Sequence, residues 1–147
     1  MRSLFILLFL GAGIAYGQDI KEKDVPAAVM ASFKKDFPKA GEMEWEKEDT
    51  GYEVEFEEAE VEITATYDAT GKLLESEKEI EQKELPASIS EYIKTNLGGK
   101  KIKETSVMTD AAGTQTFEVQ VEKTDFIFDE KGVFVKKVDK GKDKDKK

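Results

Sequence analysis

The side chains of this sequence that could do chemistry are almost all carboxylates. The chain has 32 Asp and Glu residues against 23 Lys and Arg, and it has no His and no Cys. This composition excludes Ser-His-Asp triads, cysteine nucleophiles, imidazole bases and the usual zinc, haem and iron–sulfur ligand sets. What remains is carboxylate or lysine chemistry, and the binding of hard cations or basic partners by oxygen.

The densest group of carboxylates lies between Glu42 and Glu62, where eleven Asp and Glu residues occur. Most of them alternate with apolar residues, so an antiparallel sheet would place them together on one face. Such a face either keeps an exposed sheet soluble and discourages edge pairing, or forms a negative patch for a basic partner or for divalent cations. The candidate binding patch consists of Glu53, Glu55, Glu57, Glu60 and Glu62.

Catalysis by two glutamates requires a cleft that separates the pKa values of the pair. The sequence indicates a solvated row of carboxylates and no apolar cleft around any two of them. We therefore expect no catalytic residue, no cofactor and no enzymatic activity.

Four short turns combine Asp with Gly: Asp49–Gly51, Asp68–Gly71, Asp110–Gly113 and Asp129–Gly132. Asp and Gly at short spacing also occur in calcium loops, but these turns lack the further oxygen ligands and the closing Glu of an EF-type loop. The pattern is typical of hairpin turns, in which Asp begins the turn and Gly takes the positive φ. We expect no metal ligand in these turns.

The elements that must position the carboxylates occur twice, with a period of sixty residues. VPAAVMASFKKDF (25–37) and LPASISEYIKTNL (85–97) share an apolar residue, Pro, Ala and then an apolar residue at every fourth position. This spacing predicts two helices that belong to two copies of one structural unit. After each helix the apolar period changes to two, which predicts strands; Trp45 falls in their buried register.

The fold expected from this pattern is α+β, with two tandem repeats at about 24–80 and 84–138. Each repeat is one helix packed on a four-stranded antiparallel sheet, and residues 18–23 form a short polar lead. YDATGKLL (67–74) and FDEKGVFV (128–135) are a second pair of matching segments.

The two ends of the chain differ from this pattern. Residues 1–17 contain Arg2, a short apolar run and small residues before Gln18, which is typical of a cleaved signal peptide. Residues 139–147, DKGKDKDKK, predict a disordered charged tail. We therefore expect a periplasmic or secreted protein with no stable membrane insertion after cleavage. The formal charge of −9 argues against nucleic acid as a partner.

Together these motifs resemble the PepSY-like family of β-lactamase-inhibitor-like secreted proteins, common in the Bacteroidetes envelope. The resemblance covers about residues 24–138. Its motifs are Val25-Pro26 and Leu85-Pro86, Phe37-Pro38, Trp45, Tyr52–Phe56 and Phe117–Val121, and the pairs Tyr67-Asp68…Gly71 and Phe128-Asp129…Gly132.

The resemblance implies a tandem fold like that of the β-lactamase inhibitory protein, and a binding or inhibitory role. It supplies no binding residues. We expect a non-catalytic, inhibitor-like module that recognises a protein or peptide through the exposed sheet face. A basic partner is one candidate. The alternative is a weak divalent-cation buffer or sensor of the cell envelope.

Overall fold

The computed structural model of the chain describes residues 17–139, which form two helices and nine strands. The elements in chain order are β1 (Gln18–Ile20), the 3₁₀ helix η1 (Glu22–Asp24), α1 (Ala27–Asp36), β2 (Met43–Lys47), β3 (Tyr52–Glu58), β4 (Val61–Tyr67), β5 (Leu73–Glu79), the 3₁₀ helix η2 (Gln82–Glu84), α2 (Ala87–Asn96), β6 (Ile102–Asp110), β7 (Gln115–Val121), β8 (Thr124–Phe128) and β9 (Phe134–Asp139). The α+β class, the two repeats and one helix per repeat are confirmed.

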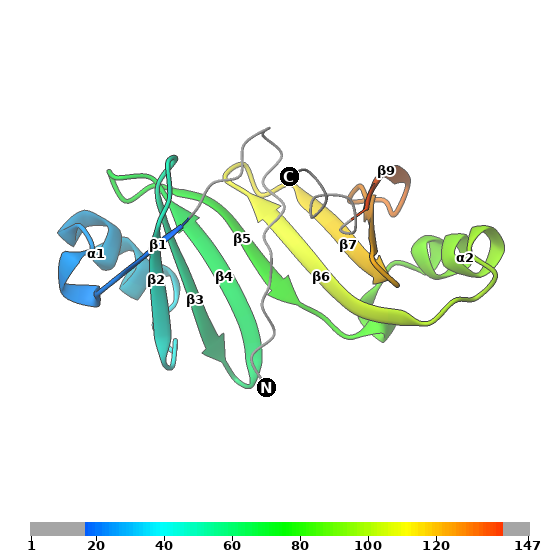
Figure 1. Ribbon diagram of the computed structural model, residues 1–147, viewed down its shortest axis with the longest axis horizontal. Coiled ribbons are helices and arrows are strands. Elements are labelled where there is room, and N and C mark those ends of the chain that lie inside the picture. The colour runs from blue at the N-terminus through cyan, green and yellow to red at the C-terminus, as the bar shows by residue number, and fades with distance from the viewer. Residues whose placement is uncertain (1–16, 140–147) are drawn as a thin grey trace, which may run out of the picture.

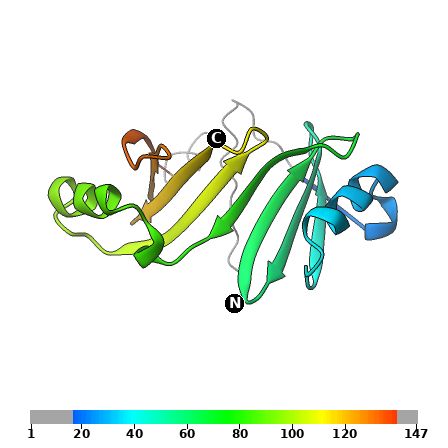
Figure 2. The same cartoon turned by 180° about the vertical axis from the view of Figure 1, so that it is seen from behind.

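The strands form one continuous antiparallel sheet in the order β1 to β9 (Figures 1 and 2). The four-stranded sheets of the two repeats join into this one sheet, because β5 pairs with β6 through Glu75–Glu79 and Ser106–Asp110. This pairing joins the two repeats edge to edge, and the two helices lie at opposite ends of the long axis (Figure 1).

Both helices cover the same face of this sheet. Val54 lies opposite Ala65, Ala65 opposite Ser76, and Ser76 opposite Thr109. Residues directly opposite one another share a face, so this line connects the apolar side of the first repeat with that of the second. Within residues 17–139, the other face carries no helix along its whole width.

The segment expected as a polar lead contains strand β1, which is a correction. β1 pairs with β2, with Ile20 opposite Trp45. In the second repeat, the residues sixty positions after Ile20 and Trp45 make the matching contact: the Ile80 N–H donates to the Thr105 carbonyl. β1 thus occupies the place that the end of β5 occupies in the second repeat. It was missed because three residues are too few to show a strand period.

The first core is built around α1. The helix begins directly after Pro26 and buries Val29 and Phe33 against the sheet. The Phe33 ring meets the rings of Trp45 and Phe56 edge to face, with centroids 5.3 Å and 5.1 Å apart. Trp45 is only 3% exposed, so its expected place in the core is confirmed.

The second core has a different set of aromatic contacts. Ile89 and Ile93 of α2 are buried, and Tyr92 stacks on Phe134 at 5.0 Å. Gly98 ends the helix with φ +63, a backbone conformation that glycine adopts without steric cost.

The β4–β5 and β8–β9 turns dock against the helices. Gly71, with φ +87, leaves no room for a Cβ, which would lie 2.6 Å from the Ala28 carbonyl oxygen. Gly132 holds the matching place beside Ser88 of α2. The Asp68 carboxylate accepts hydrogen bonds from the Thr70 and Lys72 N–H groups. Its side chain is therefore used by the turn, which supports the hairpin interpretation over a metal loop.

Both predicted terminal segments lie almost wholly outside the described residues. Only Gly17 of the expected signal peptide and Asp139 of the expected tail are described. Asp139 is the last residue of β9 and accepts a hydrogen bond from the Thr124 hydroxyl. Within residues 17–139, neither helix has the length and apolar character required to cross a membrane.

Candidate functional site: a carboxylate face

The helix-free side of β2 to β5 is a face of carboxylates. Alternation along each strand turns the apolar residues toward the helices and the glutamates to the opposite side. We call this surface the carboxylate face; it comprises Glu44, Glu46, Glu53, Glu55, Glu57, Glu62, Glu75 and Glu77.

One row of this face crosses six strands. Its residues lie directly opposite one another from strand to strand, in the order Asp19, Glu46, Glu53, Thr66, Glu75 and Asp110. Directly opposed side chains have Cβ atoms only about 5 Å apart, and like charges in such positions repel. Thr66 is the one uncharged member of the row.

A second row runs parallel to the first, in the order Glu44, Glu55, Thr64 and Glu77. Glu77 is buried and accepts a 2.6 Å hydrogen bond from the Ser106 hydroxyl of β6. Beyond Ser106 the helix-free face is less acidic: Gln120 donates to Asp125, and Ile127 is buried. The carboxylate face therefore belongs to the first repeat.

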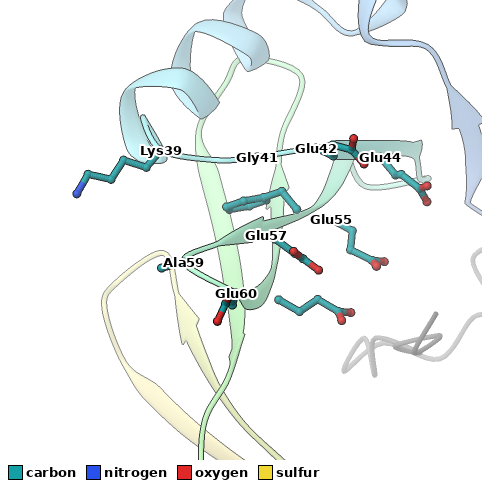
Figure 3. Close-up of a pocket in the computed structure, with 10 residues that line it drawn as sticks. Lys39, Gly41, Glu42, Glu44, Glu55, Glu57, Ala59 and Glu60 are labelled. Carbon is teal, nitrogen blue, oxygen red and sulfur yellow. The ribbon is translucent and has the colours of Figure 1, made fainter. Parts of the chain in front are cut away.

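The five glutamates predicted as a patch do not lie in one place. Glu55, Glu57, Glu60 and Glu62 line a notch of about 570 Å³ at the β3–β4 end of the sheet (Figure 3). The remaining lining residues of this acidic notch are Lys39, Gly41, Glu42, Glu44, Phe56 and Ala59. Glu53 is not among them.

A tight turn places Glu60 at the rim of the acidic notch. Ala59 and Glu60 both have positive φ, 54° and 65°, between the paired residues Glu58 and Val61. Two successive left-handed residues are typical of a two-residue hairpin. Lys39, the one cationic residue of the lining, points away from the glutamates (Figure 3). The acidic notch is thus open to a positive group from outside.

Glu62 and Glu55 interact electrostatically in the acidic notch. Burial, followed by the charge of Glu55, raises the pKa of Glu62 to about 7. In its protonated form, Glu62 donates a hydrogen bond to Glu55.

Glu53 lies instead in a second group near the β2–β3 hairpin. Carboxylate oxygens of Glu46, Glu48 and Glu53 all lie within 4.8 Å of one another. Burial, and then the charges of Glu48 and Glu46, raise the pKa of Glu53 to about 8. The pKa of Glu75, across Thr66 from Glu53, is raised by burial and by Glu77. We call Glu46, Glu48, Glu53 and Glu75 the hairpin cluster.

Several carboxylates of this face are partly buried. Three ion pairs of residues 17–139, Lys34–Glu22, Lys83–Glu81 and Lys100–Glu122, lie away from it. Glu53, Glu55 and Glu75 are partly buried, and partly buried negative charge attracts cationic groups more strongly than fully solvated carboxylates do.

The sequence-based patch missed Glu75, Glu77 and Thr66. Alternation in ESEKE (75–79) was the available signal, but its register depends on the bulge between Thr66 and Tyr67. That bulge places Glu75 opposite Thr66 and Glu77 opposite Thr64, on the same face of the sheet as the glutamates of β3 and β4.

Comparison with known proteins gives one family. The family model described as "Putative beta-lactamase-inhibitor-like, PepSY-like" matches residues 15–75 and again residues 64–136. The comparison with curated proteins gives no match.

Solved structures from Bacteroides share the fold. A BLIP-like protein from Bacteroides fragilis has a TM-score of 0.69 at 21% identity, over 83% of this chain and 92% of its own. A protein from Bacteroides eggerthii, described as "putative periplasmic", has a TM-score of 0.72 at 15% identity, over 78% of this chain and 88% of its own. A DUF2874 family protein from Bacteroides uniformis has 0.71 at 16% identity, with the same coverage.

Proposed function

Because this chain belongs to the PepSY-like, β-lactamase-inhibitor-like family, we propose that it is a non-catalytic binding module. It recognises a basic protein or peptide through the carboxylate face, and it acts in the periplasm or outside the cell. The resemblance of the family to an inhibitor supports binding over catalysis, while the choice of a basic partner comes from the charge of the face.

The observation that carries the proposal is the two rows of directly opposed carboxylates on a sheet face that no described helix covers. Repulsion along a row lowers the stability of the free protein. A cationic partner would remove that repulsion and add attraction, so binding gains from both terms.

The spacing of the carboxylates favours an extended basic segment. Glu53, Glu55 and Glu57 follow one another at every second residue of β3, which places them about 6.7 Å apart. Lysine or arginine at alternate positions of an extended peptide has the same repeat. The acidic notch, at the end of this line, has the size and charge to hold one such side chain.

Location outside the cytoplasm is supported by two observations. Residues 1–17 have the composition of a signal peptide, and the structural neighbour from Bacteroides eggerthii is described as periplasmic.

Crosslinking followed by pull-down from the native envelope tests the proposal. The bait variant changes Glu53, Glu55, Glu57, Glu60 and Glu62 to Gln, and the matched control makes five equal charge changes at the exposed positions Glu22, Asp24, Glu91, Glu122 and Glu130. The proposal is supported if wild type and control both capture the same partner. That partner should be lost with the bait variant, and also with wild type in high salt. Equal capture by both variants contradicts it.

A second candidate function is a weak divalent-cation buffer or sensor. The observation in its favour is the group of three carboxylates within 4.8 Å, because hard cations prefer oxygen ligands of this kind. Calorimetric titration with calcium separates the two functions, since a flat titration removes the second and leaves the first.

A further inference from the structure

We infer that the hairpin cluster and Thr66 form one discrete calcium-type cation site, separate from the acidic notch. This inference rests on the second candidate function and deepens it, by replacing diffuse collection of cations with a single site of named ligands. The ligands are oxygens of Glu46, Glu48 and Glu53, with Glu75 and the Thr66 hydroxyl beside them.

The first argument is the geometry of the carboxylates. The oxygens of Glu46, Glu48 and Glu53 lie within 4.8 Å of one another. A calcium ion with ligands at about 2.4 Å can join oxygens up to about 4.8 Å apart, whereas magnesium at about 2.1 Å joins oxygens up to about 4.2 Å apart. The cluster can therefore accept calcium as it stands. Magnesium suits such a site less well, because it demands near-octahedral geometry and gives up its water reluctantly.

The second, independent argument is Thr66. Its side chain is 0% exposed, and its hydroxyl oxygen has no hydrogen-bond partner. Strand register places it on the carboxylate face, directly between Glu53 and Glu75. A buried hydroxyl without a partner costs about 1–3 kcal/mol, and a cation bound between these carboxylates would supply the missing interaction.

The neighbouring carboxylates show the same deficit. Glu48 Oε2, Glu53 Oε2 and Glu75 Oε1 are also buried without a hydrogen-bond partner. With the Thr66 hydroxyl, four oxygens from the β2–β3 hairpin, β3, β4 and β5 are thus buried without a hydrogen-bond donor. A hard cation takes six to eight oxygen ligands, and the four carboxylates with Thr66 can provide most of them, with water completing the shell.

The test is calorimetric titration of the chelator-treated protein with calcium chloride and, separately, with magnesium chloride. We expect one calcium per chain with a dissociation constant of about 10⁻⁵–10⁻³ M, and at least about tenfold weaker binding of magnesium. Glu53→Gln should weaken calcium binding at least about tenfold. Glu60→Gln, an equal charge change at the rim of the acidic notch, should leave it within about twofold.

Thr66→Val removes the hydroxyl at nearly constant volume and is expected to weaken calcium binding several-fold. Circular dichroism verifies that each variant folds, and Glu48→Gln replaces Glu53→Gln if the latter does not. Several equivalent weak sites, lowered equally by Glu53→Gln and Glu60→Gln, would overturn the discrete site while leaving cation buffering in place. A flat titration would remove both, and neither result bears on capture of a protein partner.

Discussion

The docking of the β4–β5 turn on α1 makes the most sharply controlled prediction. Gly71→Ala adds a Cβ to a residue with φ +87, and that atom would lie 2.6 Å from the Ala28 carbonyl oxygen and 2.9 Å from its carbonyl carbon. Both are helix backbone atoms, which cannot move aside as a side chain would. The substitution therefore combines backbone strain with a steric overlap.

Gly113 is the matched control. It has φ +86 in the same type of turn, and its N–H donates to Asp110 as that of Gly71 donates to Asp68. No atom lies within 4 Å of the Cβ that Gly113→Ala would add. This variant therefore measures the cost of the left-handed backbone alone, about 1–2 kcal/mol.

We expect Gly71→Ala to lower the free energy of unfolding by about 3 kcal/mol or more, since a forced overlap adds about 1–3 kcal/mol to the backbone term. Urea denaturation followed by circular dichroism measures both variants, and the difference between them isolates the packing term. Equal losses in the two variants would refute the docking of this turn on α1.

Three further predictions concern charge, a hydrogen bond and the sheet edge. The raised pKa of Glu62 makes the native state bind more protons than the unfolded state between pH 4.5 and about 7, so its contribution to stability falls as pH rises through this window. Glu62→Gln should therefore leave the free energy of unfolding unchanged near pH 4 and raise it by about 0.5–1 kcal/mol at pH 8, after allowing for solvent screening. Urea denaturation at the two pH values measures the difference, and an equal effect at both values contradicts the prediction. Tyr67→Phe removes the 3.1 Å hydrogen bond from the Tyr67 hydroxyl to Asp36 and should cost about 1 kcal/mol; a thermal melt that does not change rejects this estimate. The outer edge of β9 pairs with no other described strand, and Lys136 and Lys137 stand on it. Because lysines discourage edge pairing, replacing both by Thr should produce self-association in light scattering, and a strictly monomeric variant would show that they have no such role.

The sequence was sufficient to predict the repeat, both α-helices and strands β2 to β9. Proline before each helix and apolar residues at every fourth position identify α1 and α2, because both signals are local. Alternation likewise assigns Trp45 and Val54 to the apolar side. The side of the sheet that each residue occupies follows directly from a period of two.

The join between the repeats could not be predicted in the same way. Pairing of Glu77 with Met108 is a long-range contact, and nothing in either segment specifies the other. Three-residue β1 was missed because its pairing, with Ile20 opposite Trp45, is also set by tertiary structure.

The candidate site shows the same limit. Its composition was visible as glutamates at alternate positions, but its division into two places was not. Glu53 and Glu62 seemed equivalent in sequence, yet register joins Glu53 to Glu46 and Thr66, and Glu62 to Glu57. The two groups therefore have different neighbours, and the proposed cation site involves Glu53 but not Glu62.

The central claim is that the carboxylate face binds a basic partner. Its most direct test is the affinity of the captured partner for wild type and for the variant with Gln at positions 53, 55, 57, 60 and 62, measured across a range of salt concentrations. The account predicts that the variant binds at least about tenfold more weakly and that its affinity depends less on salt, because screening acts on the charges removed. Equal affinity and equal salt dependence in the two proteins would contradict it.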